Sequence, residues 1–382
     1  MNFSDYITEI LPKTINYRLA RLGWVPPARP ITLTFSVTFA CNSRCKTCGI
    51  GEAFSRHPER AGDDLKLDEI ERIFRSLGHV YFFNVSGGEP FLRKDLPQII
   101  ELACRYLKPQ IIHIPTNALL PERIRTMSES ILDIIHNHNP RIQFSVKPSI
   151  DGVGEGHDEI RGVPGNFAKL EQTIRLLKEL DQRHANFHLE LGTVVSRFNM
   201  DCLDEIENYV HGLNVQSYRN EIAEQREEFF NIGDPITPSA EEYERLMQRF
   251  KRQIRNNIKG KKKLTYITEA LRLTYYDLAA RIMKSRQQVI PCYAGISNVH
   301  LNYNGELWPC CVLGYARPLG NLRAVDYDFD RVWFSAQARE VRKYIKQKNC
   351  ACPLANQAYS NILMNGRSLL RMMGNFLRMM KE

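Results

Sequence analysis

The feature that most constrains the fold of this chain is a regular alternation of strand-like runs and amphipathic helical segments. Six runs are rich in β-branched and aromatic residues and are bounded by turn-forming residues. They are Ile31–Thr38, His79–Ser86, Gln110–Pro115, Arg141–Ser149, Asn186–Val195 and Leu213–Tyr218. Repeated β–α units of this kind predict a parallel sheet with right-handed crossover helices.

The segments between the runs carry apolar residues at helical spacing. Examples are Leu67, Ile70, Ile73 and Leu77 in one segment and Ile124, Met127, Ile131 and Ile134 in another. The pattern predicts an α/β fold, either a doubly wound sheet or a partial barrel, and periodicity does not distinguish the two. In both folds, ligands bind at the carboxyl ends of the strands.

Composition limits the class of protein. Apolar residues make up 43% of the chain, which allows a substantial core, and no apolar run reaches the ~18 residues of a membrane span. The first thirty residues lack the apolar region of a secretory signal, so we expect a cytoplasmic protein. The net charge of +9 suits an acidic partner, a nucleic acid or an anionic membrane surface. No nucleic-acid motif is present, and we expect no nucleic-acid partner.

Three cysteines, Cys41, Cys45 and Cys48, follow the first strand-like run at C-x3-C-x2-C spacing. A 4Fe–4S cube held by only three thiolates has one iron open for a ligand, whereas a fully ligated cluster mainly transfers electrons. Zinc modules usually use paired cysteines, and disulfides need an oxidising compartment. The triplet therefore favours an iron–sulfur cluster over a zinc site or unmetallated thiols.

Together with Ser86-Gly87-Gly88-Glu89-Pro90 after the second run, this triplet resembles the signature of the radical S-adenosylmethionine (SAM) superfamily. The resemblance implies an α/β fold with a partial (β/α)6 barrel as the radical SAM core. It implies two cofactors, a 4Fe–4S cluster held by Cys41, Cys45 and Cys48, and SAM bound to the open iron. Electron transfer would then cleave SAM to a 5′-deoxyadenosyl radical.

Other residues at strand ends match SAM contacts of that family. The stretch from Ser149 to Gly162 resembles one that is common in peptide-modifying members, and Thr116-Asn117 resembles the family's Thr-Asn-Gly with Ala118 in place of glycine. Thr47 replaces the aromatic residue that usually precedes the last cysteine. The SAM contacts that the resemblance implies are Gly87, Gly88, Glu89, Pro90, Thr116, Asn117, Ser149, Asp151, Arg161, Val194 and Val195.

A second group of cysteines lies near the C-terminus. Cys292-x12-Gly305-x4-Cys310 resembles the opening of the SPASM and twitch extensions of radical SAM enzymes. Asn304-Gly305 predicts a hairpin turn that brings Cys292 and Cys310 together. Cys350 and Cys352 would complete an auxiliary 4Fe–4S cluster of the twitch type, and a zinc site made by the same thiolates is the alternative.

Cys311 is an additional candidate in this region, as a replacement ligand or as a thiol that faces the substrate. It stands where sulfatase-maturating enzymes, which this region resembles, have a proton-accepting aspartate. Cys311 is thus the one candidate catalytic residue, and the sequence assigns no other. Cys104 and Cys202 lie in helical patterns and are expected to be inert.

Both ends of the chain carry basic amphipathic segments. The first has Ile7, Ile10, Leu11, Leu19 and Leu22 beside Lys13, Arg18 and Arg21, and the last has Leu369, Met372, Met373, Phe376, Met379 and Met380 beside Arg367, Arg371 and Arg378. Such helices either dock on their own domain or make peripheral contact with an anionic membrane. We expect five parts: an N-terminal segment (1–30), the core (31–218), a helical linker or insertion (219–291), the auxiliary-cluster domain (292–355) and a basic helix (356–382).

The sequence therefore predicts an oxygen-sensitive radical SAM enzyme that abstracts hydrogen from a substrate. The resemblance favours a peptide or protein substrate, and it implies an electron donor such as flavodoxin or ferredoxin. Modification of a small molecule or a lipid is the alternative within this class. A metal-binding scaffold without catalysis and a zinc-stabilised nucleic-acid-binding protein are alternatives from other classes.

Overall fold

The computed structural model describes residues 10–215, 217–260 and 263–381. Ile7 of the predicted N-terminal segment lies outside these residues. The chain forms two compact units, each made of segments that are distant in sequence. We call Arg29–Ile236 with Asn298–Val341 the sheet unit, and Met1–Ala28, Thr237–Ser297 and Arg342–Glu382 the helical unit.

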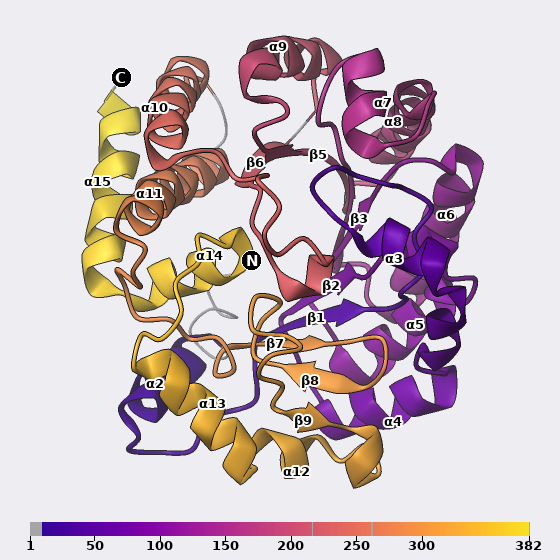
Figure 1. The fold of residues 1–382 in the computed structure, drawn as a ribbon, viewed down its shortest axis with the longest axis vertical. Helices are drawn as coiled ribbons and strands as arrows, with labels where there is room; N and C mark the ends of the chain where they lie inside the picture. The colour runs from indigo at the N-terminus through magenta and orange to yellow at the C-terminus, as the bar shows by residue number, and fades with distance from the viewer. Residues whose placement is uncertain (1–9, 216, 261–262, 382) are drawn as a thin grey trace. The chain divides into compact units, whose positions relative to one another are not determined.

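The sheet unit is built on one nine-stranded sheet with the order β6-β5-β4-β3-β2-β1-β7-β8-β9. Neighbouring strands from β6 to β7 pair in parallel, and β8 and β9 continue the sheet antiparallel (Figure 1). The strands are β1 Thr32–Ser36, β2 Phe82–Ser86, β3 Ile111–Thr116, β4 Gln143–Pro148, β5 Phe187–Val195, β6 Ser217–Ile222, β7 Asn298–Leu301, β8 Glu306–Trp308 and β9 Gly320–Asn321. The predicted α/β fold with a parallel sheet is confirmed.

Five of the six predicted runs contain or overlap their strand closely, and the sixth is displaced. The prediction was Leu213–Tyr218, whereas β6 is Ser217–Ile222. Leu213 instead ends the preceding helix, and Asn214 closes it with a left-handed φ of 51°. An asparagine at that position is a common helix terminator, so the strand begins only after the cap.

Helices cover one face of the strands (Figure 1). Those of the sheet unit are α3 Ile50–Arg56, η2 Pro58–Asp63, α4 Leu67–Leu77, η3 Pro90–Leu92, α5 Leu96–Leu102, η4 Ala103–Leu107, α6 Pro121–His138, α7 Glu155–Arg161, α8 Asn166–Arg183, η5 Met200–Cys202, α9 Leu203–Leu213, η6 Glu227–Phe229, η7 Arg323–Val325 and α12 Phe329–Trp333. Phe35 of β1 packs edge-on against Phe74 of α4 at 6.0 Å, and Phe74 in turn packs against Phe83 of β2. All three rings are fully buried, which places the core between the sheet and its helices.

The opposite face of the sheet is polar, because residues alternate between the two faces of a strand. His113 hydrogen-bonds to Ser145 across β3 and β4 at 2.8 Å. Lys147 pairs with Glu221 at 3.3 Å. Arg219 pairs with Glu190 at 3.2 Å. Parallel strands buried on both faces usually read as continuous apolar runs. Here the second face presents charged and hydrogen-bonding groups instead.

The helical unit contains α2 Leu11–Leu22, α10 Ala240–Asn257, α11 Lys263–Ser285, α14 Ala355–Met364 and α15 Gly366–Lys381. The chain enters its last segment through α13 Ala336–Lys346. Met379 of α15 is buried with Ile258, Ala270 and Leu273 in a small apolar cluster. Lys251 of α10 is joined to Asp277 of α11 by an ion pair of 2.5 Å.

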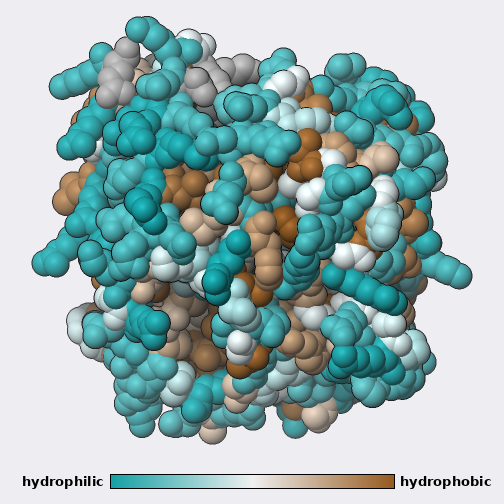
Figure 2. Space-filling view, turned by 45° about the horizontal axis from the view of Figure 1, so that its top comes forward, coloured by the Kyte–Doolittle hydropathy of each residue, from teal (hydrophilic) through white to brown (hydrophobic). Residues whose placement is uncertain are grey.

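Among the described residues, no helix is both long enough and apolar enough to cross a membrane. In the space-filling view, hydrophilic residues cover most of the visible face, and hydrophobic residues show between them in patches (Figure 2).

One carboxylate fastens the late part of the sheet unit to α4. Glu69 accepts two hydrogen bonds from Arg323, at 2.7 and 3.0 Å, and a third from the Tyr327 hydroxyl at 2.8 Å. The hydrogen bonds from Arg323 lower the pKa of Glu69 to about 2. The ionised carboxylate therefore stabilises the folded unit.

We expect Glu69→Gln to reduce the acid sensitivity of folding. Because the folded-state pKa of Glu69 lies below its ordinary value, its stabilising contribution is complete above about pH 4.5 and is lost as the pH falls towards 2. Urea unfolding of the apoprotein, followed by circular dichroism across that range, should show a steeper loss of stability in the parent. Asp68→Asn changes an exposed neighbouring acid and serves as the control. Equal acid dependence in the parent and Glu69→Gln would contradict the assignment.

Candidate functional site

The loop that carries Cys41, Cys45 and Cys48 leaves the carboxyl end of β1. Cys41 and Cys48 pack against a buried apolar cluster of Phe39, Ile50 and Tyr303. Burial raises the pKa of Cys41 to about 12 and raises that of Cys48 further. The three sulfurs are also close enough for their charges to repel one another. Such thiols become thiolates when a metal binds and compensates their charge.

In the part of the chain that the structure describes, no three histidine, cysteine or carboxylate side chains are close enough to enclose a single metal ion. A 4Fe–4S cube needs more room than one ion, because each thiolate binds a different iron of the cube. Three half-buried thiols on one short loop are a donor set of the kind that such a cube uses.

Backbone hydrogen bonds hold the cysteine loop on both sides. On one side, Gly88 and Glu89 donate to the carbonyls of Thr38 and Ala40, at 2.9 and 2.8 Å. On the other side, the amides of Arg44 and Lys46 donate to the carbonyls at the end of α7, at 3.1 and 2.8 Å. These bonds fix the loop between the β2 turn and α7.

Glycines make this close approach feasible. A Cβ on Gly88 would lie 2.1 Å from the Ala40 carbonyl oxygen, and one on Gly51 would lie 1.7 Å from that of Ser43. Gly162, with φ of 67°, would meet the Arg44 oxygen at 2.1 Å. Gly87 and Gly88 were predicted to contact SAM. In the structure, their bare Cα atoms are approached by the cysteine loop.

Glu89 is buried and its carboxylate is already engaged by three donors. Oε1 accepts from the Thr116 hydroxyl at 2.8 Å and from the Phe91 amide at 3.2 Å, and Oε2 accepts from the Asn117 amide at 2.7 Å. Burial raises the pKa of Glu89, and these hydrogen bonds act in the opposite direction. Glu89 therefore fixes the ends of β2 and β3 relative to each other. Asn117 extends this link to the cysteine loop through Asn42, at 2.8 Å.

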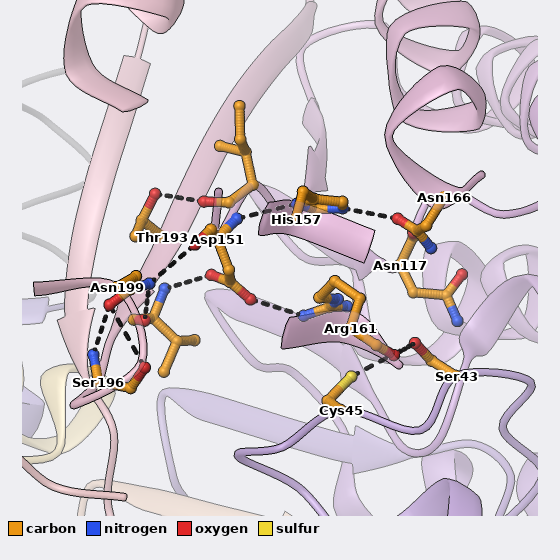
Figure 3. A network of polar contacts seen from close by, with 12 residues as sticks. Ser43, Cys45, Asn117, Asp151, His157, Arg161, Asn166, Thr193, Ser196 and Asn199 are labelled. Carbon is orange, nitrogen blue, oxygen red and sulfur yellow. Dashed lines mark hydrogen bonds and ion pairs between the residues drawn. The ribbon is translucent and has the colours of Figure 1, made fainter. Parts of the chain in front are cut away.

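Asp151 is the centre of a second buried network, drawn in Figure 3. Its Oδ2 pairs with Arg161 at 3.0 Å, and its Oδ1 accepts from the Val194 amide at 2.8 Å. Its own amide donates to His157 at 3.2 Å, and its carbonyl accepts from Asn199 at 3.1 Å. The network joins the ends of β4 and β5 to α7.

Arg161 carries this network to the cysteines. Its carbonyl accepts from the Ser43 hydroxyl at 3.1 Å, and Ser43 in turn accepts from the Cys45 thiol at 3.3 Å (Figure 3). Although burial opposes the charge, the Cys45 and Asp151 anions raise the pKa of the guanidinium. Its Nε is buried without a hydrogen-bond partner. Arg161 thus has donor capacity left beside the cysteine loop, as a site for an anionic ligand group requires.

The remaining predicted contacts occupy different environments. Ser149 is half-buried just beyond β4 and bridges to Gly192 of β5. Val194 is partly exposed, whereas Val195 is fully buried, so only Val194 has a side chain free to line an apolar wall. Pro90 is buried as the first residue of η3.

Sequence reasoning missed a charged cluster after β6. Arg226 pairs with Glu224 at 3.2 Å, its Nη1 lies 4.0 Å from a Glu228 oxygen, and it donates to Cys311 at 3.4 Å. Burial raises the pKa of Glu228 to about 7 although Arg226 opposes this. His300 of β7 lies 3.8 Å from Glu228, and burial lowers its pKa to about 3. The alternation Glu224-x-Arg226-x-Glu228 directly after a strand was the signal that could have revealed it.

The C-terminal cysteines are divided between the two units. Cys310 and Cys311 follow β8 in the sheet unit, and Cys292, Cys350 and Cys352 belong to the helical unit. Burial and the nearby Cys292 raise the pKa of Cys350 to about 11. Two of the predicted ligands, Cys292 and Cys350, therefore lie close to each other. Cys104 is buried in η4, and Cys202 is partly exposed in η5.

Comparison with known families agrees with the geometry. Residues 35–210 match the sequence model of the radical SAM superfamily. Residues 292–353 match that of SPASM, an iron–sulfur cluster-binding domain.

Among curated proteins, the chain is 23% identical over 331 residues to the antilisterial bacteriocin subtilosin biosynthesis protein AlbA of Bacillus subtilis, covering 84% of this chain and 65% of AlbA. It is 29% identical to the PqqA peptide cyclase of Granulibacter bethesdensis, covering 63% of this chain and 59% of the cyclase. It is 27% identical to the AdoMet-dependent heme synthase of Oleidesulfovibrio alaskensis, covering 79% of this chain and 74% of the synthase. The chain therefore spans less than two thirds of the first two relatives.

Among solved structures, Streptococcus suis SuiB bound to S-adenosylmethionine aligns with a TM-score of 0.59 at 16% identity. The alignment covers 90% of this chain and 74% of SuiB. At this identity, the likeness concerns the fold.

We expect Asp151→Asn to destabilise the apoprotein by about 3 kcal/mol, because it leaves the buried Arg161 without its counter-charge. Glu159→Gln removes the exposed partner of Lys46 on α7 and should change stability far less, because exposed ion pairs contribute little. Urea unfolding of both variants measures the difference. Similar losses in the two variants would show that the Asp151–Arg161 pair does not fix the site.

Proposed function

This chain belongs to the radical SAM superfamily and carries a SPASM-type iron–sulfur segment, and from this we propose that it is an enzyme that cleaves SAM to modify a peptide. The carrying observation is the cysteine loop itself. Three half-buried thiols share one loop, and Cys41 and Cys45 lie near Arg161, whose buried Nε has no hydrogen-bond partner. When bound, the 4Fe–4S cluster and SAM together supply a 5′-deoxyadenosyl radical that abstracts hydrogen.

In this proposal the residues of the chain bind, orient and shield. Cys41, Cys45 and Cys48 hold the cluster, and the free edge of Arg161 binds the carboxylate of SAM. Asp151 fixes the guanidinium from its other side. Glu89 keeps Thr116 and Asn117 in place beside the cysteine loop. Ser149 is available for a ribose hydroxyl, and Val194 for the adenine wall.

A peptide is the substrate class that the comparisons support best. By their names, AlbA is a bacteriocin biosynthesis protein and the PqqA peptide cyclase acts on a peptide, and SuiB has been crystallised with the precursor peptide SuiA. The polar inner face of the sheet fits a substrate with many amide groups, because those groups need partners when water is excluded. A small-molecule substrate is the second candidate, and the similarity to an AdoMet-dependent heme synthase favours it.

A SPASM-type segment implies auxiliary cluster chemistry. We assign its ligands to Cys292, Cys310, Cys350 and Cys352. Cys311 is in contact with Arg226 and electrostatically coupled to Glu228, which is the setting of a polar substrate-facing group rather than of a cluster ligand. Reduction by flavodoxin or ferredoxin in the cytoplasm completes the proposal, since iron–sulfur clusters with open sites need a reducing compartment.

Replacement of Cys41, Cys45 and Cys48 by alanine should remove about half of the iron bound after anaerobic reconstitution, from about eight irons per chain to about four. It should also abolish 5′-deoxyadenosine formation with dithionite and SAM. Cys202→Ala is the control and should keep both. SAM cleavage retained in the triple variant would refute the assignment. A parent protein with both clusters and no 5′-deoxyadenosine would instead indicate a scaffold.

Cys310→Ala and Cys311→Ala should differ in iron content. If Cys310 is a ligand and Cys311 is not, the first variant retains about four irons and the second about eight. Iron analysis and electron paramagnetic resonance of the reduced proteins measure both. Loss of the auxiliary signal in Cys311→Ala alone would make Cys311 the ligand and exclude it as the substrate-facing thiol.

A further inference from the structure

Helix α15 has two apolar rows, and only one of them is buried. Met379 is 1% exposed, and Met372 and Phe376 pack with it against Ile258, Ala270 and Leu273. A second row, Leu370, Met373, Leu377 and Met380, is 69%, 55%, 55% and 47% exposed. The sequence analysis placed Met372 with Met373 and Met379 with Met380 on one face. The structure separates them, because adjacent residues lie 100° apart around a helix.

The exposed row belongs to a wider concentration of apolar surface. Ten of the fourteen large apolar side chains that are exposed among the described residues lie in the helical unit, although it is the smaller unit. They include Trp24 at 73% and Leu363 on α14 at 47%. Contiguous exposed apolar residues on a helix mark an interaction surface more often than chance.

Charge on this surface has one sign. Arg367, Arg371, Arg378 and Lys381 are exposed on α15, and the helix contains no acid. From Val341 to Lys381 the sequence holds eight lysines and arginines and no aspartate or glutamate. At 100° per residue, the four cations of α15 project beside the exposed apolar row.

A polar groove adjoins the same helix within the helical unit. It encloses about 160 Å³ and is lined in part by Lys251, Arg281, Lys284 and Arg371, with Asp277 and Glu244 as its acids. The lining of this groove includes Arg371, one of the exposed cations of α15. Its cationic excess suits a phosphate group.

We propose that α15 docks on an anionic lipid bilayer, with Leu370, Met373, Leu377 and Met380 in the interface and the groove holding a lipid phosphate. A row of flexible leucines and methionines beside a row of cations is the pattern of an interfacial helix. At sixteen residues, α15 is too short to span a bilayer and long enough to lie on one. This proposal is independent of the reaction that the sheet unit catalyses.

Flotation of the anaerobically reconstituted full chain with vesicles tests the proposal. We expect binding to phosphatidylcholine vesicles that contain phosphatidylglycerol, little binding to phosphatidylcholine alone, and weaker binding at high salt. Replacement of Arg367, Arg378 and Lys381 by glutamine should weaken binding by about fivefold for each cation. Arg281→Gln with Lys284→Gln should weaken it in the same way if the groove holds a headgroup phosphate.

The apolar row is tested separately. Leu370→Gln, Met373→Gln and Leu377→Gln together should abolish flotation, whereas Ile232→Gln, at a site 61% exposed in the sheet unit, should not change it. The three side chains replaced on α15 and Ile232 are all exposed, so circular dichroism should show that both variants are folded. No flotation of the parent would overturn the proposal. Unchanged flotation of the variant with glutamine at 370, 373 and 377 would also overturn it. Light scattering that showed loss of a dimer instead would assign the row to self-association and overturn it equally.

Discussion

The buried pair of Asp151 and Arg161 is the interaction on which the rest of the candidate site depends. Taking two charges out of water costs several kcal/mol for each ion, and a buried pair is retained only when further hydrogen bonds compensate. Asp151 meets that condition through the Val194 amide, and Arg161 meets it only in part. The Nε of Arg161 is the part left without a partner, in a residue whose carbonyl contacts Ser43 of the cysteine loop. A guanidinium at this point also offsets the repulsion among three thiolates, so one charge serves the loop and a ligand.

Burial of charge also costs free energy on the polar face of the sheet and in the Arg226 cluster after β6. Lys147 of β4 pairs with Glu221 of β6 across the intervening β5, and Arg219 of β6 pairs with Glu190 of β5. Arg226 joins Glu224 near Cys311. Apolar side chains on this face would cost less free energy to bury. Under the proposed function, the charged groups retained on this face would hold a polar substrate by several directed contacts before hydrogen is abstracted. A peptide backbone offers such contacts at every residue.

The strand pattern and the short motifs could be predicted from the sequence because they are local. Alternation of β-branched runs with 3.6-residue periodicity gave the parallel sheet, and only β6 was displaced, where Asn214 ends a helix at positive φ. The reason for the glycines could not be predicted, since it depends on where the Ala40 and Arg44 carbonyls lie. The cluster of Arg226, Glu228, His300 and Cys311 joins positions up to 85 residues apart, and no local pattern reports such a contact. The sequence pattern assigned the two apolar rows of α15 to one face, because either methionine of each adjacent pair fits the helical spacing of the other apolar residues.

Glu89 shows how a motif and its role can separate. The family resemblance implies that it contacts SAM, yet three donors already occupy a carboxylate that has about four acceptor sites. At most one site is left for a ligand. Two of the occupied sites bind Thr116 and Asn117, which directly precede Ala118, a strained residue with a φ of 64° where the family has glycine. Its amide donates to Thr116, which Glu89 holds, and its carbonyl accepts from Thr173. A non-glycine residue at such a φ costs about 1 kcal/mol or more, so Glu89 contributes by fixing the strained turn at least as much as by any bond to a ligand.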